Sequence, residues 1–173
     1  MKKYGVLAAL LVVAAIGAFV VFRYGGNTYD GDSYSVTYPE NWQVMHFQPV
    51  DVAFLAPQGP QDKGFRPNIN IVVTPNDGDI SAQGALLGTI VAGLKRPDND
   101  FALLDKEEMW LHGRKCLYLR YSMTSGGNTL QGAMGIIGAD KAYIFSYTAM
   151  AGDFETYLPE FKAMLASFAP EAD

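Results

Sequence analysis

The fold of this chain is decided by residues 114–150, RKCLYLRYSMTSGGNTLQGAMGIIGADKAYIFSYTAM. Apolar and polar side chains alternate through 114–124, 129–137 and 142–150, which is the period of a β-strand. Ser125-Gly-Gly-Asn128 joins the first two runs and is typical of a tight β-hairpin. Strands joined by such short turns pair antiparallel, because parallel neighbours need a long crossover connection. The segment therefore predicts three consecutive antiparallel strands.

Further strands are predicted on the N-terminal side of this segment. Their spacing places them at 34–38, 42–47, 52–56, 68–74 and 102–111. Proline and glycine residues separate several of these runs and mark the turns between them. Together with the three strands above, these runs are enough to build one extensive sheet.

Two amphipathic helices complete the domain. The first is predicted over Ile80–Lys95, with Asp79 or Ser81 as its N-cap. Its apolar face is predicted from Ala82, Leu86, Thr89, Ile90, Gly93 and Leu94. The second is predicted over Phe154–Phe168, with Pro159 in its first turns, where a proline delays or kinks a helix.

The order of these elements indicates an α+β fold. Consecutive hairpins favour a largely antiparallel sheet of about six to seven strands, and the amphipathic helices must cover it. We therefore expect a sheet sandwiched by helices, preceded by one N-terminal transmembrane helix.

That transmembrane helix is predicted from an uncharged N-terminal segment. Lys2 and Lys3 precede eighteen residues without a charge, Gly5 to Phe22, and Arg23 follows. Eighteen helical residues span roughly 27 Å, close to the roughly 30 Å apolar core of a bilayer. We expect a signal-anchor in residues 1–24. The residues expected to lie in the bilayer include Gly5, Leu10, Val13, Ile16, Phe19 and Phe22.

The positions of the basic residues predict the side of the membrane on which the domain lies. Lys2 and Lys3 lie before the apolar segment and Arg23 alone lies close after it, which places the domain outside the cytoplasm. Cleavage after Gly17 or Ala18 is the alternative, and it would release a secreted or periplasmic protein. A glycine-rich linker is expected at 25–31 and a single domain at 32–170.

The composition excludes several classes of partner. Lys2, Lys3 and Arg23 are three of the 13 basic residues, so the part from Gly25 onward has ten basic and eighteen acidic residues, a net charge of −8. Nucleic acids and anionic lipid surfaces both need a basic face, so we expect neither to be bound by this part of the chain. A single cysteine, Cys116, excludes an internal disulfide.

No catalytic, cofactor-binding or metal-ligating set is predicted. His112 and Cys116 are about 13 Å apart along a strand, too far for a catalytic pair. His46 has no second ligand nearby in sequence, although a site assembled in space stays open. The acidic pairs Asp77/Asp79 and Asp98/Asp100 lack the spacing of a calcium loop and are expected to form turns and caps. We therefore expect no enzyme and no cofactor.

Three segments resemble the PsbP-like family, which is named after an extrinsic protein of photosystem II. They are Tyr34-Ser-Val-Thr-Tyr-Pro-Glu-Asn-Trp42, Asn68-Ile-Asn-Ile-Val-Val73 and Phe161-Lys-Ala-Met-Leu-Ala-Ser-Phe168. The resemblance covers about residues 30 to 169 and implies an antiparallel sheet between helices. It also implies a non-enzymatic role of the accessory or stabilising kind, although a fold alone does not settle function.

We expect, from these observations, a membrane-tethered, non-catalytic extracytoplasmic accessory or binding domain that acts through protein–protein contacts in an envelope complex. The loop from Pro57 to Pro67 is the expected contact site, because loops on rigid scaffolds often bind. Its candidate residues are Gln61, Lys63, Phe65 and Arg66. The alternative is an extracytoplasmic small-ligand or metal-binding protein with a pocket between sheet and helix. Tyr143, Phe145 and Tyr147 could line such a pocket, but they are expected instead to form core under the C-terminal helix.

Overall fold

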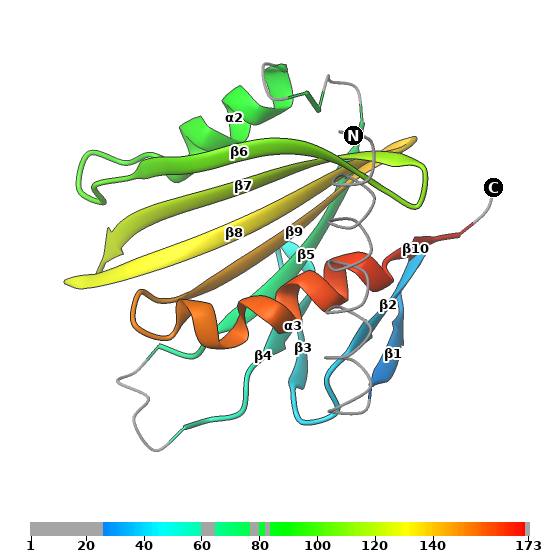
Figure 1. The fold of residues 1–173 in the computed structure, drawn as a ribbon, viewed down its shortest axis with the longest axis horizontal. Helices are drawn as coiled ribbons and strands as arrows, with labels where there is room; N and C mark the ends of the chain where they lie inside the picture. The colour runs from blue at the N-terminus through cyan, green and yellow to red at the C-terminus, as the bar shows by residue number, and fades with distance from the viewer. Residues whose placement is uncertain (1–25, 60–64, 77–79, 82–83, 172–173) are drawn as a thin grey trace, which may run out of the picture. The chain divides into compact units, whose positions relative to one another are not determined.

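The computed structural model describes residues 26–59, 65–76, 80–81 and 84–171 (Figure 1). The predicted anchor, with Gly5, Leu10, Val13, Ile16, Phe19 and Phe22, lies outside the described residues. Within the described ranges, no helix is both long enough and apolar enough to cross a bilayer. The chain divides into two compact units, one formed by Gln43–Glu155 and the other by Met1–Trp42 with Thr156–Asp173.

The larger unit contains a seven-stranded sheet in the order β3-β4-β5-β9-β8-β7-β6. All of its neighbouring strands pair antiparallel. The strands are β3 (Gln43–Phe47), β4 (Val50–Leu55), β5 (Asn68–Pro75), β6 (Ala102–Leu111), β7 (Arg114–Ser125), β8 (Asn128–Gly138) and β9 (Lys141–Met150). The predicted antiparallel sheet is confirmed, and its strands agree with the predicted ranges to within two residues at each end.

The predicted hairpin between β7 and β8 is confirmed. Leu117 lies opposite Ile136 and Leu119 lies opposite Met134. Gly126 and Gly127 form the turn with φ values of 58° and 79°. Only glycine takes such values without steric cost, and two residues in this region match the twist of the strands they join.

One face of the large sheet is covered by α2 (Ala85–Leu94). The buried cluster between them consists of Ile80, Leu87, Leu117, Leu119, Tyr121, Met134 and Ile136. The inward side chains of the helix are Leu86, Leu87, Ile90, Val91 and Leu94. Thr89 and Gly93, which were predicted on this face, are exposed instead.

The helix α2 is shorter at its N-terminus than predicted. It begins after Gly84, which provides no side-chain cap, and Gly84 N–H donates to the Ser81 carbonyl in a preceding turn. Asp79, one of the expected caps, lies outside the described residues. Ile80, Ser81 and Gly84 therefore precede the helix, and Ile80 contributes to the core from outside it.

Asn99 fixes the C-terminal end of α2 to the sheet. Its side-chain amide donates to the Leu94 carbonyl at 2.6 Å, and its side-chain oxygen accepts the Arg96 N–H at 3.1 Å. Its own carbonyl accepts the Thr124 N–H of β7 at 2.6 Å. A helix end leaves its last carbonyls without partners, so this asparagine satisfies one of them and ties the end to β7.

The smaller unit contains a three-stranded sheet in the order β1-β2-β10. Its strands are β1 (Asn27–Asp30), β2 (Tyr34–Tyr38) and β10 (Ala169–Pro170). Most of α3 (Phe154–Ser167), which contains Pro159, belongs to the same unit. Trp42 packs edge-on against Tyr157 of this helix, with ring centroids 5.8 Å apart.

The linker predicted at 25–31 differs from the structure, because four of its residues form β1. All four pair with β2, and the ring of Tyr29 lies 6.1 Å from that of Tyr34. A short polar run with one aromatic residue has no strand period of its own. Pairing with β2 therefore decides its conformation.

Candidate functional site

The exposed large hydrophobic side chains of the described residues lie on the two outer strands of the large sheet. Met45 and Phe47 lie on β3, and Leu103, Leu104 and Trp110 lie on β6. Figure 1 shows these two strands at opposite ends of the sheet. Exposed apolar residues on open strand edges are features of strands that bind another chain.

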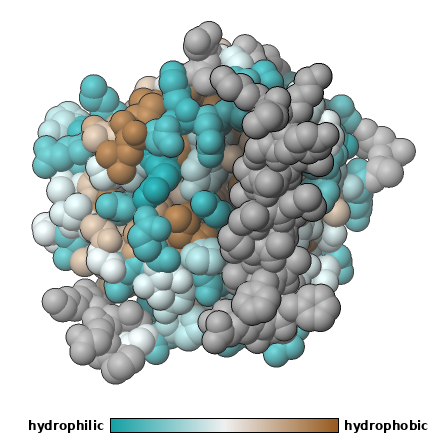
Figure 2. Space-filling view, in the orientation of Figure 1, coloured by the Kyte–Doolittle hydropathy of each residue, from teal (hydrophilic) through white to brown (hydrophobic). Residues whose placement is uncertain are grey.

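The strand β6 is the longer of the two and carries the more exposed aromatic side chain. Eight of its ten residues are exposed, and only Met109 and Leu111 are half-buried. Trp110 is 69% exposed, so an indole that would normally be buried lies in solvent. Four consecutive charged residues, Asp105 to Glu108, occupy the middle of the strand. Figure 2 shows that apolar side chains reach the visible face only as small patches in a largely hydrophilic surface.

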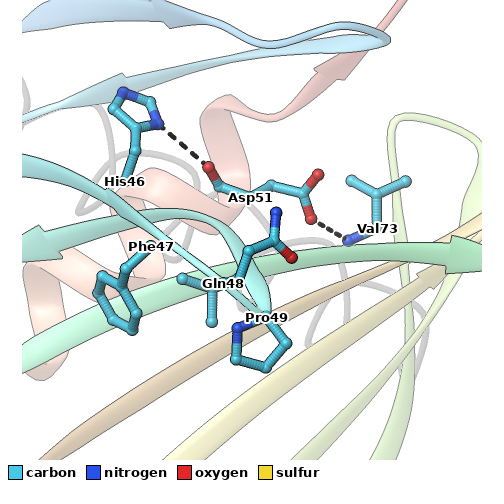
Figure 3. Close-up of a pocket in the computed structure, with 7 residues that line it drawn as sticks. His46, Phe47, Gln48, Pro49, Asp51 and Val73 are labelled. Carbon is cyan, nitrogen blue, oxygen red and sulfur yellow. Dashed lines mark hydrogen bonds between the residues drawn. The ribbon is translucent and has the colours of Figure 1, made fainter.

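A recess lies at the hairpin between β3 and β4 (Figure 3). Its volume is about 530 Å³, and its lining consists of His46, Phe47, Gln48, Pro49, Val50, Asp51 and Val73. The alternative function expected a pocket between sheet and helix, whereas this recess is built almost entirely from one hairpin. The register of β3 and β4 shifts between Met45 and Phe47, which alters the strand course beside the recess.

Two hydrogen bonds shape the recess. One Asp51 carboxylate oxygen accepts the Val73 N–H at 2.7 Å, and His46 Nδ1 lies 3.2 Å from the Asp51 carbonyl oxygen (Figure 3). Asp51 thereby links β4 to β5 at the place where their regular pairing ends at Val52 and Ile71. Asp51 therefore stabilises the contact between β4 and β5. The polar groups that the recess presents to a ligand include the Asp51 carboxylate and the His46 imidazole.

Hydrogen bonds join the two ends of the predicted contact loop, Pro57 to Pro67. Ala56 N–H donates to the Pro67 carbonyl at 2.9 Å. Arg66 donates from Nε and Nη2 to the Ala56 carbonyl at 3.1 and 2.6 Å, and from Nη1 to Gln43 Oε1 at 3.1 Å. Phe65 is half-buried. Gln61 and Lys63, the other two predicted contact residues, lie outside the described residues.

Replacing Arg66 with methionine should lower the free energy of unfolding by about 1–2 kcal/mol. Methionine keeps the length of the side chain but leaves the Ala56 carbonyl without its two guanidinium donors. Urea unfolding of the two proteins measures the difference. Unchanged stability together with lost partner capture would show instead that Arg66 acts as a contact residue.

His112 and Cys116 are placed in different environments. His112 and Gly113 form an exposed turn between β6 and β7, with φ values of 49° and 77°. Cys116 is fully buried in β7, and burial raises the pKa of its thiol to about 12. The reactive form of cysteine is the thiolate, so the thiol is inert near neutral pH.

Cys116 should therefore resist alkylation in the folded protein. With its pKa raised from 9.0 to about 12, only a small fraction of the thiol ionises at pH 8, and the buried sulfur is shielded from reagent. We expect iodoacetamide to label the protein in denaturant at least about a hundredfold faster than in buffer. Mass spectrometry of timed samples measures both rates, and equal rates would contradict the placement of Cys116.

The other titratable candidates are also accounted for. Asp77 and Asp79 lie outside the described residues, whereas Asp98 and Asp100 lie in the exposed turn after α2. Asp100 has a φ of 43°, a conformation that aspartate tolerates in turns. In the described part of the chain, no three His, Cys, Asp or Glu side chains gather in a group that could hold a metal ion.

The aromatic residues proposed to line a pocket are core residues. Tyr143, Phe145 and Tyr147 are at most 4% exposed. The Tyr147 hydroxyl donates to the Phe154 carbonyl at 2.8 Å, and the two rings stack with centroids 5.1 Å apart.

The fold is that of an α+β protein with a large antiparallel sheet, whose outer strands β3 and β6 each pair with a single strand in the described part of the chain. No protein-family model matches the sequence, and a search of curated proteins finds no significant match. Solved structures do match. The cyanobacterial PsbP, CyanoP, of Synechocystis sp. PCC 6803 is 17% identical, with a TM-score of 0.63 over 86% of this chain and 94% of that one.

Two further structures share this architecture. PA94 of Pseudomonas aeruginosa, a protein of unknown function, is 18% identical with a TM-score of 0.57, over 86% of this chain and 99% of that one. LpqN of Mycobacterium tuberculosis, described as involved in cell envelope biogenesis, is 12% identical with a TM-score of 0.58, over 90% and 96%. The resemblance to the PsbP-like family is thus confirmed in the fold.

Proposed function

We propose that this protein is a membrane-tethered, non-catalytic accessory domain outside the cytoplasm that acts through protein–protein contacts. The observation that carries the proposal is that, among the described residues, the exposed large hydrophobic side chains lie on the two outer strands of the large sheet. The predicted signal-anchor supports the location. The fold shared with CyanoP and with the envelope protein LpqN is consistent with such a role.

Open edges suit this function because they offer main-chain groups as well as side chains. A strand that adds to a sheet edge gains a ladder of hydrogen bonds, and side chains beside the edge select the partner. A soluble domain without partners usually protects such edges with charges and keeps aromatic residues off them. β6 carries such charges from Asp105 to Glu108. The aromatic side chains of Trp110 and Phe47, which are 69% and 49% exposed, depart from the second part of that pattern.

Site-specific photo-crosslinking in native membranes tests the proposal. The full-length chain would carry benzoylphenylalanine at Trp110, at Phe47 or, as a control, at the exposed turn residue Glu40. We expect discrete adducts from Trp110 or Phe47 and none from Glu40. Absence of adducts from both edge positions would overturn the proposal.

The proposed location has its own test. A protease added to intact cells or spheroplasts should degrade the domain, and the domain should pellet with membranes after carbonate washing. Release into the soluble envelope fraction would instead favour the alternative, in which cleavage after Gly17 or Ala18 frees the domain.

The recess at the β3–β4 hairpin favours the second candidate function, a small-ligand-binding protein. Its volume is within the range of ligand pockets, and His46 and Asp51 supply polar groups beside Phe47 and Pro49. A thermal-shift screen of metabolites and metal ions tests it with the full-length protein. A ligand that raises the Tm, with the rise lost in His46→Ala, would support it, and no stabilising compound would remove it.

A further inference from the structure

The side of β6 that faces away from β7, here called the β6 edge, carries no further strand in the described part of the chain. It is formed by residues 102–111, and eight of these ten are exposed. One irregularity interrupts it, since the register with β7 shifts between Leu103 and Asp105. From Asp105 to Leu111 the pairing with β7 is continuous, so this part is a regular strand. The Lys106 N–H donates to Asp105 Oδ1 at 2.8 Å, and a strand added to this edge must replace that bond.

The two faces of the β6 edge differ in charge. Directly opposite residues of paired strands point to the same face, so Asp105 and Glu107 share a face with Arg120 and Tyr118. Glu155 also reaches this face, because its carboxylate accepts a hydrogen bond from Arg120 Nη2 at 2.8 Å. Three carboxylates and the Arg120 guanidinium therefore meet around Asp105 and Glu107, whereas Arg114, opposite Leu111, lies at the far end of the same face.

The pKa of the Tyr118 hydroxyl is affected by the charged groups on this face. Burial raises the pKa of Tyr118 to about 12. Arg120 acts in the opposite direction, and the carboxylates of Glu107, Glu155 and Asp105 add to the rise. Around Asp105 and Glu107, carboxylates thus outnumber guanidinium groups.

The opposite face of the β6 edge is nearly balanced in charge and carries the indole. Lys106, Glu108 and Trp110 lie on this face together with Lys115 of β7. Glu108 and Lys115 form a salt bridge of 3.0 Å. Trp110 remains 69% exposed and offers an aromatic surface beside the open edge.

We propose that the β6 edge binds an extended basic segment of another protein as an added β-strand. Alternate lysine or arginine side chains of that segment lie against Asp105 and Glu107, and the side chains between them lie against Trp110. The inference rests on the proposed function and names the class of its partner. The charge difference between the two faces selects a segment in which basic and apolar residues alternate.

A second copy of this chain fits the same edge poorly. A two-fold axis through two paired β6 strands brings the same faces together, so Asp105 and Glu107 of both copies would share one face. Like charges opposite each other destabilise strand pairs. An anionic lipid surface is repelled for the same reason. A basic segment is the occupant whose charge matches.

Tryptophan fluorescence provides a test with the full-length protein in detergent micelles. The chain has two tryptophans, and Trp42 is 5% exposed whereas Trp110 is 69% exposed. Binding at the β6 edge should therefore shift the emission of Trp110 to shorter wavelength and protect it from acrylamide. The probe is a synthetic peptide that alternates lysine and valine. The Trp110→Phe variant shows which part of the signal comes from Trp42.

The matched controls separate pairing from general charge attraction. We expect no binding by a peptide that alternates glutamate and valine, nor by the lysine–valine peptide methylated on alternate backbone amides. The double change Asp105→Asn and Glu107→Gln should weaken binding by about tenfold, because it removes two charge pairs. Glu40→Gln, the same change at an exposed turn, should leave binding unaltered. Circular dichroism confirms that each variant is folded.

The outcomes distinguish this inference from the function on which it rests. Equal binding of the methylated peptide, or an unchanged affinity of the double variant, would overturn the β6 edge as a strand-addition site. Cross-links from Phe47 but not from Trp110 would overturn it as well, while the accessory function would stand. Loss of cross-links at both positions would remove the function itself.

Discussion

Gly132→Ala should lower the free energy of unfolding by about 2–3 kcal/mol, the upper part of the range for core overpacking. Gly132 of β8 lies opposite Tyr121 of β7, and the Tyr121 ring lies over it. A Cβ built on Gly132 would overlap ring atoms of Tyr121. Tyr121 is 3% exposed and belongs to the cluster beneath α2, so its ring has no free space to enter. Urea unfolding followed by circular dichroism measures the loss.

Gly88→Ala is the matched control for this change. Gly88 lies within α2, and nothing lies within 4 Å of a Cβ built there. Alanine in a helix interior is more favourable than glycine by about 0.5–1 kcal/mol, so the same substitution should stabilise. In a protein that already carries Tyr121→Ala, Gly132→Ala should lower the free energy of unfolding much less than it does in the native protein. Additive losses would show that the ring and the glycine do not interact.

Tyr147→Ala should cost about 3–5 kcal/mol, the range found when a large buried aromatic side chain is truncated. Tyr147 is fully buried in β9, and its ring stacks on Phe154. Its hydroxyl also donates to the Phe154 carbonyl at 2.8 Å. The variant loses the ring, the stacking and the hydrogen bond at once.

Tyr147→Phe separates these contributions. Phenylalanine keeps the ring and its stacking but leaves the Phe154 carbonyl without this donor, which should cost about 1–2 kcal/mol. Denaturation by urea, with both variants compared at the same temperature, gives the two losses. A phenylalanine variant as unstable as the alanine variant would show that the hydroxyl, and not the ring, holds this site.

The strands could be predicted from the sequence because their signals are local. The alternation within β7 and the glycine pair between β7 and β8 are read from neighbouring residues. The start of α2 was less predictable. Apolar spacing continues upstream of it, whereas the chain forms a turn at Ser81 and Gly84.

The division into two sheets could not be predicted, because strand order depends on partners distant in sequence. β2 and β3 follow each other across a short turn, as hairpin strands do, yet they belong to different sheets. For the same reason the sequence did not show which strands are edges. One signal was available, since four consecutive charges from Asp105 to Glu108 leave a strand no buried face. That run, with Trp110 beside it, marks the open edge.

The strand order also sets the sequence of events when the chain emerges from a ribosome or an export channel. β5 pairs with β9, and residues 76–140 lie between them. β3, β4 and β5 therefore emerge long before the strand that completes their side of the sheet. The meander from β6 to β9 uses only neighbouring strands, and contacts between near neighbours form faster than distant ones. Until β9 has emerged, the backbone N–H and C=O groups on one side of β5 lack their native partners. Chaperones, and not the native fold, must keep that edge from aggregating at this stage.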